Sequence, residues 1–174
     1  MLKRFFNAAI VYASLALAGG VFYREFTKYA EFTGKTNLAF LHTHYFMLGM
    51  FFFLVLALLE RAFTFSEQKG SKGWVIVYHI GLNITTACLF LRGLAQATMR
   101  ELSPAMNGAL SGVSGIGHIL LGSAMIALLI LVRKSAIKTQ HNKSARLGLT
   151  TAARLRFFAE KDRLWLVGTL GSRR

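Results

Sequence analysis

Four apolar segments, each about as long as a membrane crossing, constrain the fold of this chain more than any other feature. A helix needs about 20 consecutive apolar residues to cross roughly 30 Å of hydrocarbon. Windows of this length place the segments at 5–22, 38–59, 73–95 and 111–132. The chain is also 54% hydrophobic, which is too apolar for a soluble domain of this size. We therefore expect an integral membrane protein.

The connections between these segments are short and polar. They read "REFTKYAEFTGKTN", "ERAFTFSEQKGSK" and "RELSPAMNG". Short connections force consecutive helices to run antiparallel. The expected fold is an all-α, up-down four-helix transmembrane bundle over residues 1–134, followed by a basic tail over 135–174. "SAIKTQHNKSARLG" in the tail is typical of a disordered or membrane-surface segment, and "LRFFAEKDRLWLVGTL" of an interfacial amphipathic helix.

The net charge of +14 is unevenly divided along the chain. Residues 1–132 hold ten Lys/Arg and five Glu, for +5, whereas 133–174 hold eleven Lys/Arg and two acids, for +9. The tail lies just beyond the last apolar segment, so an anionic bilayer surface is its nearest partner. No aromatic-basic recognition pattern accompanies the charge, and we therefore expect no nucleic-acid partner.

Lysines and arginines near the helix ends predict the orientation. With the amino terminus in the cytoplasm, the cytoplasmic side carries Lys3, Arg4, Arg61, Lys69, Lys72, Arg133, Lys134 and Lys138. The outer side carries Arg24, Lys28, Lys35 and Arg100, with Arg92 close below it. The excess on the first side predicts that both termini are cytoplasmic.

This topology places three histidines at one level of the outer leaflet. At about 1.5 Å per residue, His42 and His44 lie roughly 6 to 9 Å below the outer boundary and His118 about 10 Å below it. Ionisable side chains are costly in hydrocarbon and occur there mainly where they have a partner. Arg24 and Arg92 lie near the same boundary, whereas His79 belongs to the opposite leaflet. A site formed by His118 with one of the two histidines of the second segment is therefore expected.

Helical spacing indicates which of these side chains share a face. Ser111, Gly115, His118 and Gly122 recur at intervals of four, three and four, so small residues surround one imidazole. This stripe leaves room for a bulky group, although close helix packing is an equal alternative.

The two histidines of the second segment project to nearly opposite sides of their helix. His42 shares its face with Gly49, and His44 shares its face with Met47 and Phe51. We favour His44 as the partner of His118 because it lies deeper, while Gly49 favours His42.

Axial ligation of a b-type haem fits this arrangement. Two neutral imidazoles must approach a flat macrocycle from opposite sides at one depth, with small residues nearby and cations for the propionates. His118 and either His44 or His42 are the expected iron ligands. Gly115 and Gly122 are expected to make room, and Arg24 and Arg92 to bind the propionates.

Other interpretations compete with haem. Two or three of His42, His44 and His118, with Met47 or Met50, would be suitable copper ligands. A structural or assembly subunit would use its polar residues only to hold helices together. No CxxC or HExxH motif supports a zinc site.

Two further polar groups have alternative roles. Arg92 can form an ion pair with Glu25 across the bundle instead of binding a propionate. His79, Asn83 and Thr86 form a polar stripe, for which we favour hydrogen bonding between helices over a proton path or a second polar site.

Several stretches resemble those of known families. "GGVFYREFTKY", "LHTHYFMLG", "FLRGLAQ" and "SGVSGIGHILL" resemble an uncharacterised family of small four-helix bacterial membrane proteins over about residues 1–134. His42, His44 and Gly49 more distantly resemble the HxHxxxxG stretch of haem- and copper-containing membrane proteins of nitric-oxide response, and the histidine helix of haem-copper oxidase catalytic subunits.

These resemblances imply a bacterial inner-membrane location and a haem ligand at His42 or His44. Four helices cannot hold the oxidase machinery, and neither a copper-site histidine pair nor a tyrosine crosslink motif is recognisable. We therefore expect electron transfer or gas or redox sensing, with the bilayer and a membrane redox partner or quinone as partners. An oligomer is compatible with the pattern.

Overall fold

The computed structural model describes the backbone of residues 1–171 and the side chains of residues 1–145, 147, 148, 150 and 151. The chain divides into two compact units, Met1–Lys134 and Ser135–Arg174. The first unit contains the candidate site, and the second is part of one long helix.

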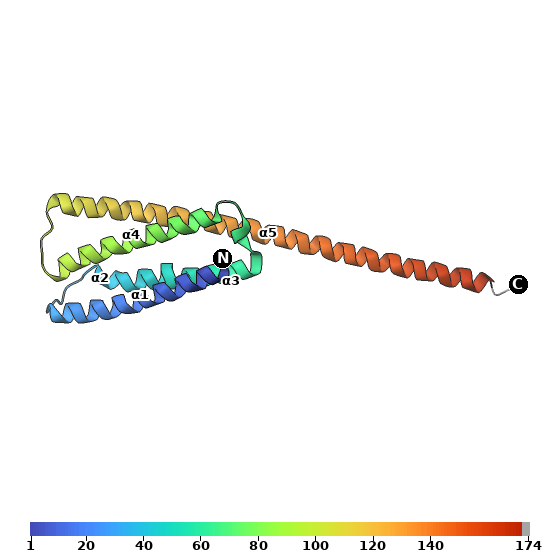
Figure 1. Cartoon of the computed structure of the whole chain (residues 1–174), viewed down its shortest axis with the longest axis horizontal. Helices are drawn as coiled ribbons and strands as arrows, with labels where there is room; N and C mark the ends of the chain where they lie inside the picture. The colour runs from blue at the N-terminus through green and yellow to red at the C-terminus, as the bar shows by residue number, and fades with distance from the viewer. Residues whose placement is uncertain (172–174) are drawn as a thin grey trace. The chain divides into compact units, whose positions relative to one another are not determined.

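The first unit is all-helical, as predicted. It contains α1 (Leu2–Tyr29), a second span built from α2 (Leu38–His44), η1 (Tyr45–Phe51) and α3 (Phe52–Phe63), then α4 (Ser71–Ala97) and the beginning of α5 (Pro104–Gly171). A short 3₁₀ turn, η2 (Phe65–Glu67), precedes α4. Consecutive spans run in opposite directions (Figure 1).

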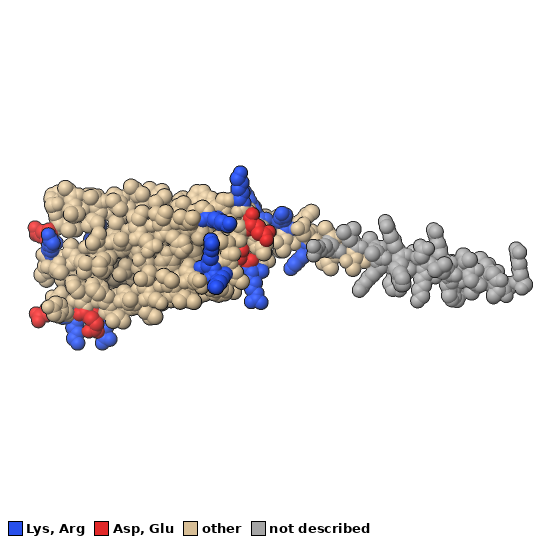
Figure 2. Space-filling view, viewed as in Figure 1, with Lys and Arg blue, Asp and Glu red and all other residues tan. Residues whose placement is uncertain are grey.

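Four helices are long and apolar enough to cross a membrane, at Leu2–Tyr29, Leu38–Phe63, Ser71–Ala97 and Pro104–Ala145. Charged side chains gather toward the two ends of the first unit and leave a band without charged side chains between them on the face shown (Figure 2). Large apolar side chains such as Ile10, Leu17 and Ile119 are exposed within that band. The chain is therefore a multi-pass membrane protein.

The backbone of the second unit is helical as far as Gly171. The backbone of residues 135–148 is thus part of α5, and their expected position at the membrane surface stays a prediction. The predicted amphipathic face of residues 155–170 depends on side chains that lie outside the described residues.

Aromatic side chains fill the core at the end of the bundle where α1 begins. Phe5 stacks on Phe65 with ring centroids 5.7 Å apart, and Phe52 stacks on Tyr78 at 4.3 Å. Phe5, Phe53, Phe65 and Tyr78 are all essentially inaccessible. Well-packed aromatic rings lose little rotamer freedom and fill volume efficiently, so this end holds the spans in a defined register.

Helices α4 and α5 approach each other closely through glycines. A Cβ on Gly81 would lie 2.5 Å from the backbone nitrogen of Leu121, and one on Gly117 would lie 2.7 Å from Oγ1 of Thr85. Small residues allow membrane helices to bring their backbones together in this way. The contact fixes the height at which α5 meets the rest of the bundle.

A π-helix interrupts the second span immediately after His44. In η1, a Cβ on Gly49 would lie 2.6 Å from the Tyr12 ring of α1, so only glycine allows this approach. The Tyr78 hydroxyl donates a hydrogen bond to the Leu48 carbonyl at 2.7 Å. The wider turn changes the direction in which the following side chains project. Segments of π-helix often occur at functional sites.

Candidate functional site

His44 of α2 and His118 of α5 lie close together, with His44 half-buried and His118 exposed. Their ring centroids lie 6.5 Å apart and the ring planes are nearly perpendicular, at 88°. Each Nδ1 lies 2.8 Å from a carbonyl oxygen one turn earlier in its own helix, Phe40 for His44 and Ser114 for His118. We call these two side chains the imidazole pair.

The hydrogen bonds of the imidazole pair determine its tautomers. A carbonyl oxygen can only accept, so Nδ1 of each neutral ring must carry the hydrogen. Nε2 of each ring then keeps its lone pair. Metal-binding histidines commonly have this arrangement, in which a backbone carbonyl orients the ring and leaves the other nitrogen for the metal.

His42 lies elsewhere, on the face of α2 that packs against α1. A Cβ on Gly20 would lie 3.7 Å from Cβ of His42. Gly49, which shares the face of His42 in the sequence pattern, also packs on α1. Nδ1 of His42 is buried and has no hydrogen-bond partner among the described residues. The face shared with Gly49 therefore points to α1, and among the described residues His44 is the histidine whose ring lies beside His118.

The glycines on either side of His118 border open space. A Cβ added to Gly115 or Gly122 would have no neighbouring atom within 4 Å. These two glycines therefore do not pack helices together within this chain, whereas Gly117 on another face of α5 does. Space beside His118 is what a bulky ligand would need.

Arg92 of α4 bonds to the stripe of α5 that carries His118. Its Nη2 donates to Oδ1 of Asn107 at 3.0 Å and to Oγ of Ser111 at 2.7 Å. Ser111 is seven residues from His118, or about 10 Å along the helix. The alternative ion pair between Arg92 and Glu25 is not formed, because the guanidinium bonds to α5 instead.

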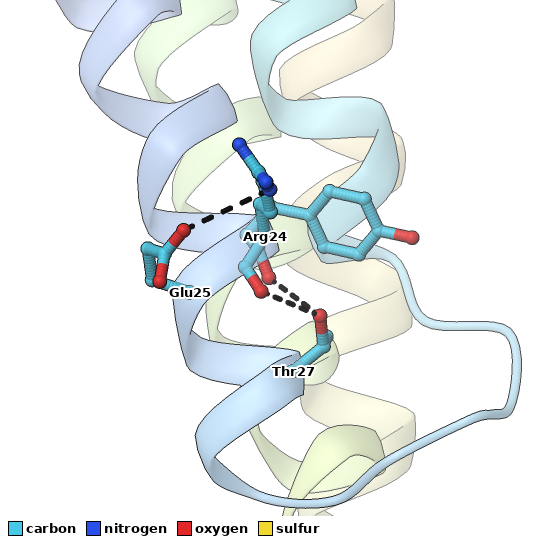
Figure 3. A network of polar contacts seen from close by, with 4 residues as sticks. Arg24, Glu25 and Thr27 are labelled. Atoms are coloured by element: carbon cyan, nitrogen blue, oxygen red, sulfur yellow. Dashed lines mark hydrogen bonds and ion pairs between the residues drawn. The ribbon is translucent and has the colours of Figure 1, made fainter.

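Arg24 lies at the far end of α1, near its connection to α2 (Figure 3). Its Nε is 3.8 Å from Oε1 of Glu25, and both side chains are largely exposed. Thr27 on the next turn donates to the carbonyls of Tyr23 and Arg24. An exposed pair of this kind contributes little to stability, so the Arg24 guanidinium can exchange Glu25 for another anion.

A second polar group lies between α1, the second span and α4. The Tyr12 hydroxyl is 2.6 Å from Nδ1 of His79 and accepts from Nδ2 of Asn83 at 3.1 Å. The Tyr45 hydroxyl donates to Oδ1 of Asn83 at 3.3 Å and accepts from Thr86 at 2.9 Å. We call these five residues the tyrosine cluster. It confirms the expected hydrogen bonding between helices.

Sequence reasoning missed the two tyrosines of this cluster. Tyr12 and Tyr45 fit the apolar faces of their spans, and aromatic residues are common in membrane helices. Only their hydroxyl groups carry the polar role, and helix periodicity does not reveal which tyrosines reach the polar stripe of α4. The one available signal was the polar stripe of α4, because no polar partner for it was recognised on another span.

Two of the residues proposed as copper ligands, His44 and His118, lie together. Within the described part of the chain, no group of three or more His, Cys, Asp or Glu side chains is placed to hold a metal ion. Only His44 and His118 meet, and Met47 is largely exposed. Two imidazoles on separate helices, each with an available Nε2, are the donor set that the fold presents.

A family match places the chain among known sequences. Residues 2–135 match the family described as "Protein of unknown function (DUF2871)". The match spans the first structural unit, including the imidazole pair and the tyrosine cluster. No curated protein and no solved structure shows significant similarity to the chain. Because the family match covers more than half of the residues, this chain belongs to the DUF2871 family.

Proposed function

We propose that this protein binds a b-type haem within the membrane and acts in electron transfer or in sensing of diatomic gases or redox state. The observation that carries the proposal is the imidazole pair, in which two rings from different helices each have Nδ1 bonded to a carbonyl. His44 and His118 would be the axial ligands. The resemblance of "LHTHYFMLG" to haem-binding helices implies a ligand at His42 or His44.

The spacing of the imidazole pair fits ligation of one metal ion from two sides. With metal–nitrogen bonds of about 2 Å, two imidazoles on opposite sides of an ion have ring centres roughly 6 Å apart. The observed separation is 6.5 Å. Gly115 and Gly122 supply open space beside His118. Two neighbouring imidazoles and open space beside one of them are what an iron held by two histidines would need.

Two arginines are available to bind the propionates. Arg92 reaches the stripe of His118 two turns away through Ser111, and Arg24 is exposed near the same end of the bundle. Guanidinium groups bind carboxylates through paired hydrogen bonds. A bound haem would supply one-electron chemistry, and displacement of one histidine would allow it to bind a gas.

Absorption spectroscopy tests the proposal directly. Protein purified in mild detergent from cells able to make haem should show a Soret band, and its visible bands should sharpen on reduction. Colourless protein with stoichiometric copper would favour copper binding at the same histidines. Protein with neither cofactor would favour a structural or assembly role.

We further propose that the protein lies in a bacterial inner membrane with both termini in the cytoplasm. The excess of lysine and arginine on the side of the α3–α4 connection supports this orientation. Electrons or gas signals from the outer leaflet would then reach the imidazole pair, and a membrane redox partner or quinone would be the exchanging molecule.

Cysteine labelling of intact cells tests the orientation. Thr33 lies between α1 and α2, Glu67 lies between α3 and α4, and both are exposed. A membrane-impermeant maleimide should label Thr33→Cys in intact cells and Glu67→Cys only after permeabilisation. The native Cys88 is buried, so the unsubstituted protein serves as the blank. The reverse pattern would place the imidazole pair in the inner leaflet.

A further inference from the structure

The tyrosine cluster reaches the membrane-facing surface of the bundle. Asn83 is exposed and His79 is half-buried, although both lie near the middle of α4. Exposed apolar side chains occur on the same two helices, at Val11 and Leu15 of α1 and at Ile76 and Ile80 of α4. Polar groups are rare at this depth unless they meet a partner or a ligand.

One nitrogen of the cluster remains available to such a partner. Asn83 uses Nδ2 for Tyr12 and for the His79 carbonyl, and Oδ1 for Tyr45. Nδ1 of His79 pairs with Tyr12. Nε2 of His79 has no partner among the described residues, and it is not one of the fully buried unpaired atoms there. It therefore reaches the surface.

The neighbours of His79 allow it either to donate or to accept at Nε2. A tyrosine hydroxyl can donate to Nδ1 or accept from Nδ1–H. The Tyr12 hydroxyl at 2.6 Å therefore supports both neutral tautomers. In one, Nε2 carries a hydrogen and binds a carbonyl oxygen. In the other, Nε2 accepts a hydrogen bond from a hydroxyl group.

Stacked rings hold His79 in place. The imidazole stacks on Phe53 at 4.6 Å and 9°, and on Tyr12 at 5.6 Å and 23°. Tyr12 also stacks on Tyr45 at 5.7 Å. This aromatic layer fixes the plane of the imidazole, so Nε2 is presented in a constant direction.

From these observations we propose that the tyrosine cluster binds the ring of a lipid-soluble quinone or quinol, with His79 Nε2 as the contact to a ring oxygen. The ligand must be apolar to reach this depth. Its oxygen must be an acceptor in one state and a donor in another to use both tautomers. A quinone carbonyl and a quinol hydroxyl meet both requirements.

The site lies on a different face of the second span from the imidazole pair. His44 contacts His118 of α5, whereas the next residue, Tyr45, contacts Tyr12 and Thr86. Two adjacent residues of one helix thus belong to the two clusters. Quinone binding at His79 does not depend on haem binding at His44, so the two proposals can fail separately.

Photolabelling of the full-length protein in lipid nanodiscs tests this proposal. An azidoquinone should crosslink to peptides of α1 and α4 around His79, and decylubiquinone should compete. Loss of one hydrogen bond in His79→Ala should weaken competition about tenfold. His44→Ala should be labelled like the unsubstituted protein, even where it lacks haem. Leu91→Ala, at an exposed position three turns away on α4, serves as the control for surface substitution.

A second variant keeps the test valid where His79→Ala does not fold. Tyr12→Phe retains the stacked ring and removes only the hydroxyl that pairs with Nδ1, so decylubiquinone should compete several-fold less well. Equal competition in both folded variants would overturn the proposal. Crosslinks confined to other helices, or crosslinks between two protein chains through this face, would also overturn it, the latter by showing that a second copy covers the cluster.

Discussion

Replacing His118 with alanine should abolish haem binding, and His44→Ala should do the same. The two rings come from different helices and their centroids lie 6.5 Å apart, so loss of either ring removes one side of the ligation. Six-coordinate b-type haem needs both axial nitrogens. The measurement is haem content per protein, with the reduced absorption spectrum, after purification in the same detergent.

His42→Ala and His79→Ala are the matched controls for this experiment. Both remove an imidazole from a membrane span, but His42 packs against α1 and His79 hydrogen-bonds to Tyr12. Both variants should therefore retain haem. Full haem content in His118→Ala would contradict the proposed function. Loss of haem in His42→Ala together with retention in His44→Ala would transfer the ligand role to His42.

Filling the space beside His118 separates ligand loss from misfolding. A Cβ on Gly115 meets no atom within 4 Å, so Gly115→Leu should leave the bundle intact. The larger side chain would occupy the space that a macrocycle needs, and haem content should fall although both histidines remain. Unchanged haem content in this variant would mean that the cofactor lies on another side of His118.

Hydrophobic length was sufficient to predict the four spans, because crossing a bilayer requires a minimum run of apolar residues whatever the details of packing. It could not predict the π-helix at Tyr45–Phe51. That feature depends on a close contact between Gly49 and the Tyr12 ring of another span, and a tertiary contact of this kind leaves no periodic signal in the sequence.

The depth of the histidines in the membrane and the helical faces that they share predicted the candidate site only in part. Depth favoured His44 as the neighbour of His118, and the structure does place these two together. Helical spacing correctly placed His42 and Gly49 on one face, but it could not say that this face packs on α1. Arg92 was expected to reach a propionate or Glu25, and its bonds to Asn107 and Ser111 were missed because they depend on how closely α4 and α5 approach.

Gly81→Ala should destabilise the protein strongly, because Gly81 lies where α4 and α5 come close together. The new Cβ would lie 2.5 Å from the Leu121 nitrogen and 2.9 Å from the Gly117 oxygen. Backbone atoms cannot rotate away as a side chain can, so α4 and α5 would have to separate. Overpacking of a close contact costs about 1 to 3 kcal/mol. The apparent midpoint of thermal unfolding in detergent should fall clearly below that of the unsubstituted protein.

Gly112→Ala makes the same chemical change on α5 where a Cβ meets nothing within 4 Å. Alanine favours a helix over glycine by up to about 1 kcal/mol, so this variant should be as stable as the original or more stable. The Gly81 contact also sets the height of His118 opposite His44, and Gly81→Ala should therefore lose haem before it unfolds completely. Equal stability of the two glycine variants would show that α4 and α5 do not meet at Gly81, and the facing of the imidazole pair would then lack its structural basis.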